Sequence, residues 1–386
     1  MRNISVLIKP ASGKCNLRCK YCFYHDVIDN RQIKDYGMIS VECTENLIKK
    51  AIDYTKNGFC TFAFQGGEPI LRGLDYFNKF IDLVNRYNRN NTKVNYVIQT
   101  NGILIDEKWA KFFANNDFLV GLSLDGTKDV NNINRVDARG EGTYTKIIKT
   151  SKLLKKYNVQ YNILTVVNKS NASKIRSIYN FYKRNNFKYM QYIPCLDPVG
   201  DKHGTKQYSL TPERYEQFLK ALFDLWYNDI KTNNIISIRF FDNILSMISG
   251  RVPESCDMKG YCSIQNVIES DGSVYPCDFY VIDDYKLGNI NNNTFEEIHS
   301  SYAAKNFINS SMKLNYNCKD CKWISLCRGG CRRYREIEDK SESYRNYYCK
   351  AFYNFYEYSY CRFIELAQML RYSQLKKNSI HRSALI

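Results

Sequence analysis

The chain has 386 residues, of which 44% are hydrophobic, so it is long enough for two packed domains or one large barrel with additions. Its formal net charge is +17, but the lysines and arginines are scattered and no nucleic-acid-binding motif accompanies them, which argues against nucleic acid as a partner. No apolar run approaches the roughly 20 residues of a membrane span, and no secretory signal is visible, so we expect a cytoplasmic protein without a membrane anchor.

Strand and helix patterns alternate through the first half of the chain. Short apolar runs predict strands at 5–9, 60–65, 94–99, 118–123, 159–167 and 189–193. Amphipathic stretches between them predict helices at 41–54, 74–87, 106–115, 144–157 and 173–184. This alternation indicates parallel β-α-β units, and six of them form an incomplete α/β barrel.

Four unusual loops directly follow predicted strands of this barrel. They are the cysteine-containing loop 15–22, the Gly-Gly-Glu-Pro loop 66–69, the Thr-Asn-Gly loop 100–102 and the Leu-Asp-Gly loop 124–126. Active sites of α/β barrels lie at the carboxyl ends of the strands. We therefore expect these loops to meet in one site.

The second half of the chain has a different pattern. Residues 196–207 predict a loop, 211–228 a helix, 235–241 a strand, and 351–375 a helix rich in aromatic residues. Asp271-Gly272 predicts the turn of a hairpin over 267–275. We divide the chain into a partial barrel with a bridging helix (1–235), a cysteine-rich domain (236–375) and a frayed tail (376–386).

Three of the fifteen cysteines, Cys15, Cys19 and Cys22, form a C-x3-C-x2-C motif just after the first strand. In a reducing compartment, clustered cysteines indicate metal or catalytic sites more often than disulfides. Three thiolates can bind three irons of a cubane [4Fe-4S] cluster and leave the fourth iron open for chemistry. The plainer alternatives are three unrelated buried thiols or part of a zinc site.

Eight cysteines of the second half are enough for two sites with four thiolates each: Cys256, Cys262, Cys277, Cys318, Cys321, Cys327, Cys331 and Cys349. Their spacing suits structural zinc and iron–sulfur clusters about equally. We expect Cys43, Cys60 and Cys361 to be buried as small apolar side chains, and Cys195 to lie near the site.

The cysteine motif, with an aromatic residue before its last cysteine, resembles the signature of the radical S-adenosylmethionine superfamily. The C-x2-C-x5-C-x3-C run that starts at Cys318 resembles the SPASM domain of such enzymes. With residues 21–25, 64–69, 99–102 and 269–280, these motifs make nearly the whole chain similar to the anaerobic sulfatase-maturating enzymes. The resemblance implies a partial (β/α)6 radical S-adenosylmethionine barrel followed by a C-terminal cysteine-rich SPASM domain.

The resemblance also implies the cofactors, namely S-adenosylmethionine and three [4Fe-4S] clusters. Cys15, Cys19 and Cys22 match the ligands of the cluster that binds S-adenosylmethionine. Cys256, Cys262, Cys277 and Cys331 match one auxiliary cluster, and Cys318, Cys321, Cys327 and Cys349 match the other. Spacing alone groups Cys331 with Cys318, Cys321 and Cys327, so this crossed assignment depends on the resemblance.

For S-adenosylmethionine, the resemblance places the Gly67 backbone at the methionyl amino group and Ser123 and Arg135 at the carboxylate. A guanidinium is well suited to bind a carboxylate. Tyr21 and Leu196 match residues that flank the adenine. Each also has an ordinary alternative: a tight turn for Gly67, a solvated charge for Arg135, and apolar packing for Tyr21 and Leu196.

The activity implied is oxidation of a Cys or Ser in a C/S-x-P-x-R sequence of a sulfatase to Cα-formylglycine. Asp278 matches the base of this reaction, and partial burial beside Phe279 and Tyr280 would raise its pKa toward a useful range. The alternative for Asp278 is a solvent-facing turn residue. Tyr24 and Gln65 are expected near the substrate.

Pro194 departs from the family pattern, in which we expect a polar Asn that can contact peptide. The identity of the substrate therefore stays more open than the family. The expected partners are a sulfatase polypeptide and an electron donor such as flavodoxin or ferredoxin, acting with a monomer. The alternatives are an enzyme that crosslinks or otherwise modifies a small ribosomal peptide, and a zinc-stabilised binding protein.

Overall fold

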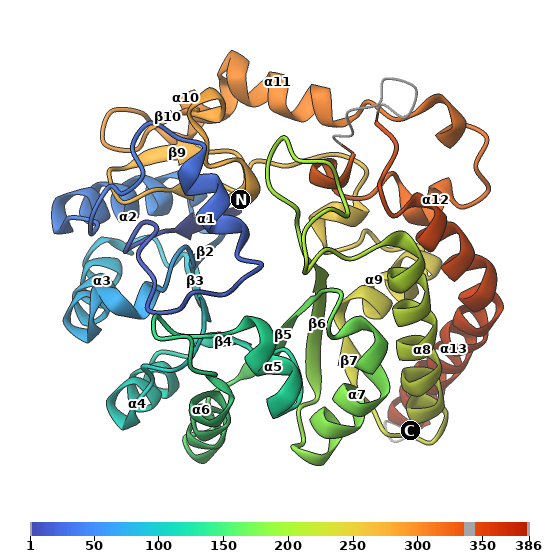
Figure 1. Cartoon of the computed structure of the whole chain (residues 1–386). Helices are drawn as coiled ribbons and strands as arrows, with labels where there is room; N and C mark the ends of the chain where they lie inside the picture. Colours follow the sequence, from blue (N-terminus) through green and yellow to red (C-terminus); the bar gives the residue numbers. More distant parts are fainter. Residues whose placement is uncertain (1, 336–343, 384–386) are drawn as a thin grey trace.

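The computed structural model describes residues 2–335 and 344–383. Its centre is one curved sheet with the strand order β10-β9-β8-β1-β2-β3-β4-β5-β6-β7 (Figure 1). Strands β1 to β7 are parallel, with bounds Ile4–Ile8, Phe59–Phe64, Lys93–Thr100, Leu119–Ser123, Tyr161–Val167, Tyr189–Pro194 and Ser237–Ile238. The other three strands are β8 (Val267–Ile268), β9 (Ser273–Tyr275) and β10 (Gly288–Asn289).

Helices lie around the outside of the parallel strands (Figure 1). Those of the barrel half are α1 (Phe23–Asp29), α2 (Val41–Thr55), α3 (Leu74–Tyr87), α4 (Glu107–Asn115), α5 (Lys128–Asn134), α6 (Tyr144–Lys156) and α7 (Ile175–Arg184). Those of the second half are α8 (Pro212–Lys231), α9 (Arg239–Ile248), α10 (Phe295–Ser300), α11 (Tyr302–Ser311), α12 (Ile324–Cys327) and α13 (Cys349–Ser383).

Helix α3 illustrates why these segments form and where they pack. Its apolar side chains recur at helical spacing, so Phe77, Phe80 and Val84 share one buried face. Phe77 and Phe80 contact Phe64 of β2 with ring centroids 4.9 and 5.0 Å apart. Each fully buried phenylalanine contributes about 1.5–3 kcal/mol, so the covering helices fix the strands whose ends carry the site.

The expected partial barrel with alternating strands and helices is confirmed. The predicted hairpin over 267–275 forms as β8 and β9, and Gly272 at its turn has a φ of 84°. The strand predicted over 235–241 is wrong beyond residue 238, because Phe241, Ile244 and Met247 recur at helical spacing and bury one face of α9. Helix α13 continues to Ser383, past the expected end at residue 375, and residues 384–386 lie outside the described residues.

The cysteine-rich half is joined to the barrel through the sheet itself. Strand β8 pairs with β1 in parallel, with Leu7 opposite Val267 and Ile8 opposite Ile268. Farther along the chain, Phe279 packs edge-on against Phe23 of α1, with the two ring centroids 4.9 Å apart. These contacts bring the segment after the hairpin next to the cysteine loop of the barrel.

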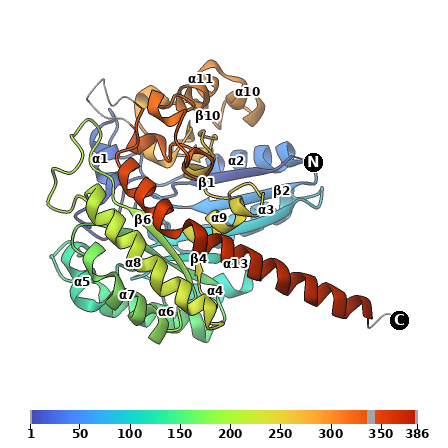
Figure 2. The ribbon, with the colours of Figure 1, turned by 90° about the vertical axis from the view of Figure 1, so that its right-hand side faces the viewer.

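On the opposite side of the molecule, α8, α9 and α13 pack together beside β6 (Figure 1). Figure 2 shows α13 running past α8 with its C-terminal end extending away from the rest of the fold. None of the helices in the described part of the chain combines the length and apolar character that crossing a membrane requires.

Candidate active site

The cysteine loop connects β1 to α1 and brings three thiols together. Burial raises the pKa of Cys15 to about 12, and the nearby thiols of Cys19 and Cys22 add to this rise. The loop is held by two backbone hydrogen bonds, from Arg18 N to Val136 O at 2.7 Å and from Lys20 N to Asn134 O at 3.0 Å. The loop therefore reaches across the barrel to the segment that carries Arg135.

The Gly-Gly-Glu-Pro loop packs directly against the cysteine loop. The Gly67 N–H donates to Ser12 O at 3.0 Å, and the Glu68 N–H donates to Lys14 O at 2.7 Å. A Cβ at position 67 would lie 2.0 Å from the Lys14 carbonyl oxygen. Glycine at 67 thus permits close contact with the cysteine loop, whereas the sequence suggested close approach to a cofactor.

Glu68 links this loop to the next one. Its buried carboxylate accepts hydrogen bonds from Thr100 Oγ1 at 2.7 Å and from Asn101 N at 2.8 Å. The loops after β1, β2 and β3 are therefore in contact, as their shared position at the carboxyl ends of the strands predicts.

The loop after β4 contributes a buried polar group. The Tyr21 hydroxyl donates to Asp125 Oδ2, and Arg135 donates to the Tyr21 oxygen at 3.1 Å. Ser123, at the end of β4, accepts from Gln99 Nε2 at 2.9 Å. The structure thus brings Tyr21 to Arg135, and it gives a contact to Asp125, whose loop was expected in the site without a role for this residue.

Arg135 has a donor left over for an anionic ligand. Its guanidinium is buried, and its Nε has no hydrogen-bond partner among the described residues. A carboxylate is the ligand that such a buried guanidinium fits, so the residues present are compatible with S-adenosylmethionine. Leu196, expected beside the adenine, is a buried apolar side chain after β6.

The first auxiliary set, Cys256, Cys262, Cys277 and Cys331, comprises the four cysteines expected to bind one auxiliary cluster, and they come from distant parts of the sequence. Burial raises the pKa of Cys277 well above its ordinary value, and the thiols of Cys331 and Cys256 contribute. Burial also raises the pKa of Cys331, with contributions from Cys256 and Cys262. Cys331 therefore lies close enough to Cys256, Cys262 and Cys277 for these thiols to affect one another.

The second auxiliary set, Cys318, Cys321, Cys327 and Cys349, comprises the four cysteines expected to bind the other auxiliary cluster. Burial raises the pKa of Cys327 to about 12, and the thiols of Cys349, Cys318 and Cys321 contribute. Within the described ranges, no group of three or more His, Cys, Asp or Glu side chains is arranged so that it could hold a metal ion. A cubane spreads its ligands over four irons, so it accommodates wider spacing than one zinc ion does.

Asp278 lies between the cysteine loop and the first auxiliary set. It follows Cys277 and begins a short 3-10 turn, and it is close enough to Cys22 to affect that thiol. Its carboxylate is buried, forms an ion pair with the Lys9 ammonium, and accepts from Gln65 Nε2 at 2.6 Å. Asp278 is therefore not a solvent-facing turn residue.

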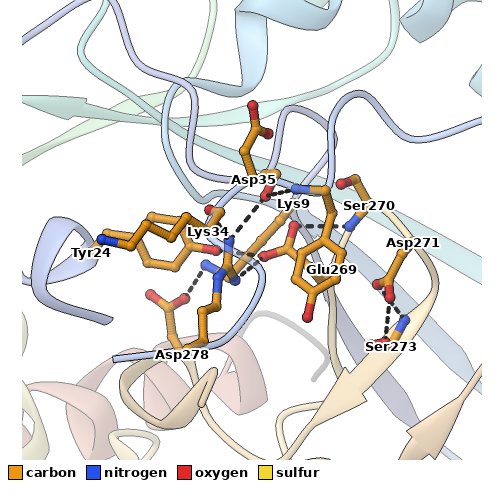
Figure 3. Close-up of polar contacts among 12 residues, drawn as sticks. Lys9, Tyr24, Lys34, Asp35, Glu269, Ser270, Asp271, Ser273 and Asp278 are labelled. Carbon is orange, nitrogen blue, oxygen red and sulfur yellow. Dashed lines mark hydrogen bonds and ion pairs between the residues drawn. The ribbon is translucent and has the colours of Figure 1, made fainter. Parts of the chain in front are cut away.

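The residues beside Asp278 form a larger buried polar cluster (Figure 3). The Tyr24 hydroxyl donates to Glu269 Oε2 at 2.8 Å, and Arg31 donates to the same oxygen at 2.7 Å. The Lys9 ammonium lies 3.8 Å from the centre of the Tyr24 ring. Tyr24 was expected near the substrate, but its hydroxyl is engaged by Glu269 and burial raises its pKa well above the ordinary value.

Sequence reasoning missed Lys9, Arg31 and Glu269 as members of the site. For Lys9 a signal was available, since it directly follows the first strand at the barrel end where active-site residues gather.

Pro194 has no N–H to donate, but its backbone carbonyl oxygen accepts a hydrogen bond from the Tyr334 hydroxyl at 2.5 Å.

Of the three remaining cysteines expected to be buried, two are. Cys43 and Cys60 are buried, and so is Cys195. Cys361 is exposed on α13, so the expectation that it is buried is wrong.

Comparison with known proteins agrees with this geometry. Residues 10–182 match the Radical SAM superfamily, and residues 256–322 match the iron-sulfur cluster-binding domain called SPASM. The chain is 49% identical to the cysteine-type anaerobic sulfatase-maturating enzyme of Clostridium novyi, over 97% of this chain and 100% of the relative.

More distant and structural relatives agree. The chain is 32% identical to the serine-type enzyme of Bacteroides thetaiotaomicron, over 92% of this chain and 88% of the relative. The solved structure of native anSMEcpe with bound AdoMet and Kp18Cys peptide has 46% identity and a TM-score of 0.91, covering 95% of this chain and 99% of that one. The chain therefore belongs to the anaerobic sulfatase-maturating enzymes of the radical S-adenosylmethionine superfamily.

Proposed function

We propose that this enzyme oxidises a Cys, or a Ser, in a C/S-x-P-x-R sequence of a sulfatase to Cα-formylglycine, with Asp278 as the base. The observation that carries the proposal is the Asp278 side chain, which is only 8% exposed and whose carboxylate is held by Lys9 and Gln65 where the two halves of the chain meet. The similarity to sulfatase-maturating enzymes along nearly the whole chain supports the choice of substrate.

The cysteine sets fit three [4Fe-4S] clusters. Cys15, Cys19 and Cys22 would hold the cluster with the open iron, and the two sets of four would hold the auxiliary clusters within the proposed domain 236–375. Ser123 and Arg135 would bind the carboxylate of S-adenosylmethionine, the Gly67 backbone its amino group, and Tyr21 and Leu196 its adenine. When bound, S-adenosylmethionine would supply a 5′-deoxyadenosyl radical that removes a hydrogen atom from the substrate, and the auxiliary clusters would supply an acceptor for one electron.

The protein's own chemical task is to take up a proton. In the proposed reaction the substrate Cβ loses one hydrogen atom and one electron, and its thiol or hydroxyl loses a proton to Asp278. A hydroxyl gives the aldehyde directly, whereas a thiol gives a thioaldehyde. Water hydrolyses the thioaldehyde to the aldehyde and hydrogen sulfide, which completes the atom balance.

Cysteine is the proposed preferred substrate residue. The identity to the cysteine-type relative from Clostridium novyi is 49%, against 32% to the serine-type relative from Bacteroides thetaiotaomicron. Pro194 lies at the end of β6, where a polar side chain was expected from the family pattern.

The proposal includes a small one-electron donor such as flavodoxin or ferredoxin and a monomeric enzyme.

The test is an anaerobic reaction with S-adenosylmethionine, a chemical reductant and two peptides that differ only in carrying C-x-P-x-R or S-x-P-x-R. We expect 5′-deoxyadenosine together with an aldehyde-containing peptide, detected by mass spectrometry and hydrazine trapping, and faster reaction of the cysteine peptide. Deoxyadenosine without aldehyde from either peptide contradicts the proposed substrate and favours modification of another ribosomal peptide.

A further inference from the structure

Lys9 is a fully buried lysine that the proposed reaction does not explain. It follows the last residue of β1, and its side chain has 0% exposure. An ammonium buried in a protein is costly unless it is paired. Its contacts are the Asp278 carboxylate and the face of the Tyr24 ring (Figure 3).

Lys9 and Gln65 hold the same carboxylate from two neighbouring strands. Ile8 is opposite Phe64 in the parallel pair β1–β2, so the residues that follow them emerge side by side, and Gln65 N donates to Ile8 O at 2.9 Å. Lys9 binds Oδ1 of Asp278 and Gln65 binds Oδ2. Two donors from the rigid barrel therefore fix both oxygens of a carboxylate that belongs to the other half of the chain.

Lys9 is itself held in place by the surrounding cluster. The Tyr24 ring lies under the ammonium, and the Tyr24 hydroxyl is anchored on Glu269. Glu269 is fully buried and paired with Arg31 at 2.7 Å. The ammonium is therefore restrained by two contacts, one with an aromatic face and one with the carboxylate.

We propose that Lys9 is a positioning residue that sets the orientation of the Asp278 carboxylate toward the substrate. This inference rests on the proposed role of Asp278 as the base. It adds that proton removal depends on the Lys9 ammonium, which the barrel supplies, and that peptide binding does not depend on it. Small misplacements of a reacting group cost large factors in rate, so the effect should appear in kcat.

The first test compares Lys9→Met with the wild type and with Lys34→Met, which changes an exposed lysine after α1 that pairs with exposed Asp29. We expect Lys9→Met to bind iron and peptide normally, with kcat lower by ~10–100-fold, KM changed by less than about threefold, and more deoxyadenosine formed per aldehyde. Lys34→Met should match the wild type.

The second test is chemical rescue. Lys9→Ala leaves a space the size of the removed side chain, and ethylammonium added to the assay should restore part of kcat, whereas ethanol should not. Unchanged kcat in Lys9→Met overturns the proposal, as does failure of ethylammonium to act on iron-loaded Lys9→Ala. If neither variant takes up iron, Lys9 serves folding and the proposal is also overturned.

A third readout does not depend on the reaction. Lys9→Met and Asp278→Asn should each lower the thermal unfolding midpoint, because each leaves a buried charge unpaired, and the double variant should be no less stable than either single one. Additive losses would show that the two side chains are uncoupled. A wild type that makes no aldehyde contradicts the proposed function, and this cycle still tests Lys9 in that case.

Discussion

At the scale of single residues, Asp278 determines the predicted outcome of the reaction. In Asp278→Asn the substrate thiol has no carboxylate to receive its proton, so aldehyde formation should fall by ~100-fold or more. Cleavage of S-adenosylmethionine should persist, because it needs no proton removal from the peptide. Deoxyadenosine by chromatography and aldehyde by mass spectrometry measure the two separately.

A matched control for this variant is Asp284→Asn, which changes an exposed carboxylate a few residues further on. It should leave both products unchanged. Iron content must be measured in parallel, because Asp278→Asn also removes the partner of fully buried Lys9. Undiminished aldehyde in an iron-loaded Asp278→Asn protein would remove Asp278 from the mechanism.

The site residues predicted from the sequence are those that belong to local motifs. Cys15, Cys19 and Cys22 lie within one loop, and Asp278 follows a cysteine in a recognisable segment. Lys9 pairs with a residue 269 positions away, and Arg31 with one 238 positions away. Such pairs are created by tertiary packing, so one sequence read locally does not show which residues are partners.

At the scale of elements, the contact between the loops after β1 and β2 depends on Gly67. A Cβ there would lie 2.0 Å from the backbone oxygen of Lys14, one residue before Cys15, so Gly67→Ala should displace the cysteine loop and lower the iron content after reconstitution. Gly140→Ala is the control, because its Cβ meets no atom within 4 Å and the change carries only the cost of a positive φ, roughly 1–2 kcal/mol. Equal iron content in both variants would contradict this role.

The start of α9 gives the protein a pH-dependent stability. Burial, with a contribution from the Glu254 charge, raises the pKa of Asp242 to about 6, while its hydrogen bond from Ser237 opposes the rise. The folded state therefore binds this proton more tightly than the unfolded state, where the pKa is about 4. Stability is consequently lost as the pH rises from about 4 through about 6.

Asp242→Asn removes this loss and keeps an acceptor for Ser237. Near pH 7.5 the variant should unfold at a higher urea concentration than the wild type, and its free energy of unfolding should be higher by at most about 3 kcal/mol. The difference should shrink near pH 5. Urea unfolding followed by circular dichroism at both pH values measures it, and a difference independent of pH would contradict the assignment.

The long periodic elements of the barrel were predicted correctly from their patterns, and the hairpin of β8 and β9 from its turn. The strand expected over 235–241 was wrong beyond residue 238, because β7 pairs with β6 over only Ser237 and Ile238 before α9 begins. Strands β7, β8 and β10 each have two residues. At that length alternation of polar and apolar residues carries no signal, so pairing with the existing sheet decides the structure.

At the scale of the whole molecule, the two halves share one sheet and a set of buried charges. A fragment of residues 1–235 would expose the edges of β1 and β6 and would leave Lys9 without Asp278 and Arg31 without Glu269. We expect this fragment to aggregate or to melt without cooperativity, as measured by sedimentation and circular dichroism. A monomeric fragment with a sharp transition would show that the barrel half folds independently.

The pairing of β1 with β8 also imposes an order in time during synthesis. Lys9 leaves the ribosome 269 residues before Asp278, an interval of roughly 13–54 s at ~5–20 residues per second. Throughout that interval β1 has an open edge and its lysine has no carboxylate. The first strand to be made is thus among the last to be completed, and the nascent barrel depends on the remainder of its own chain to protect it from association with other chains.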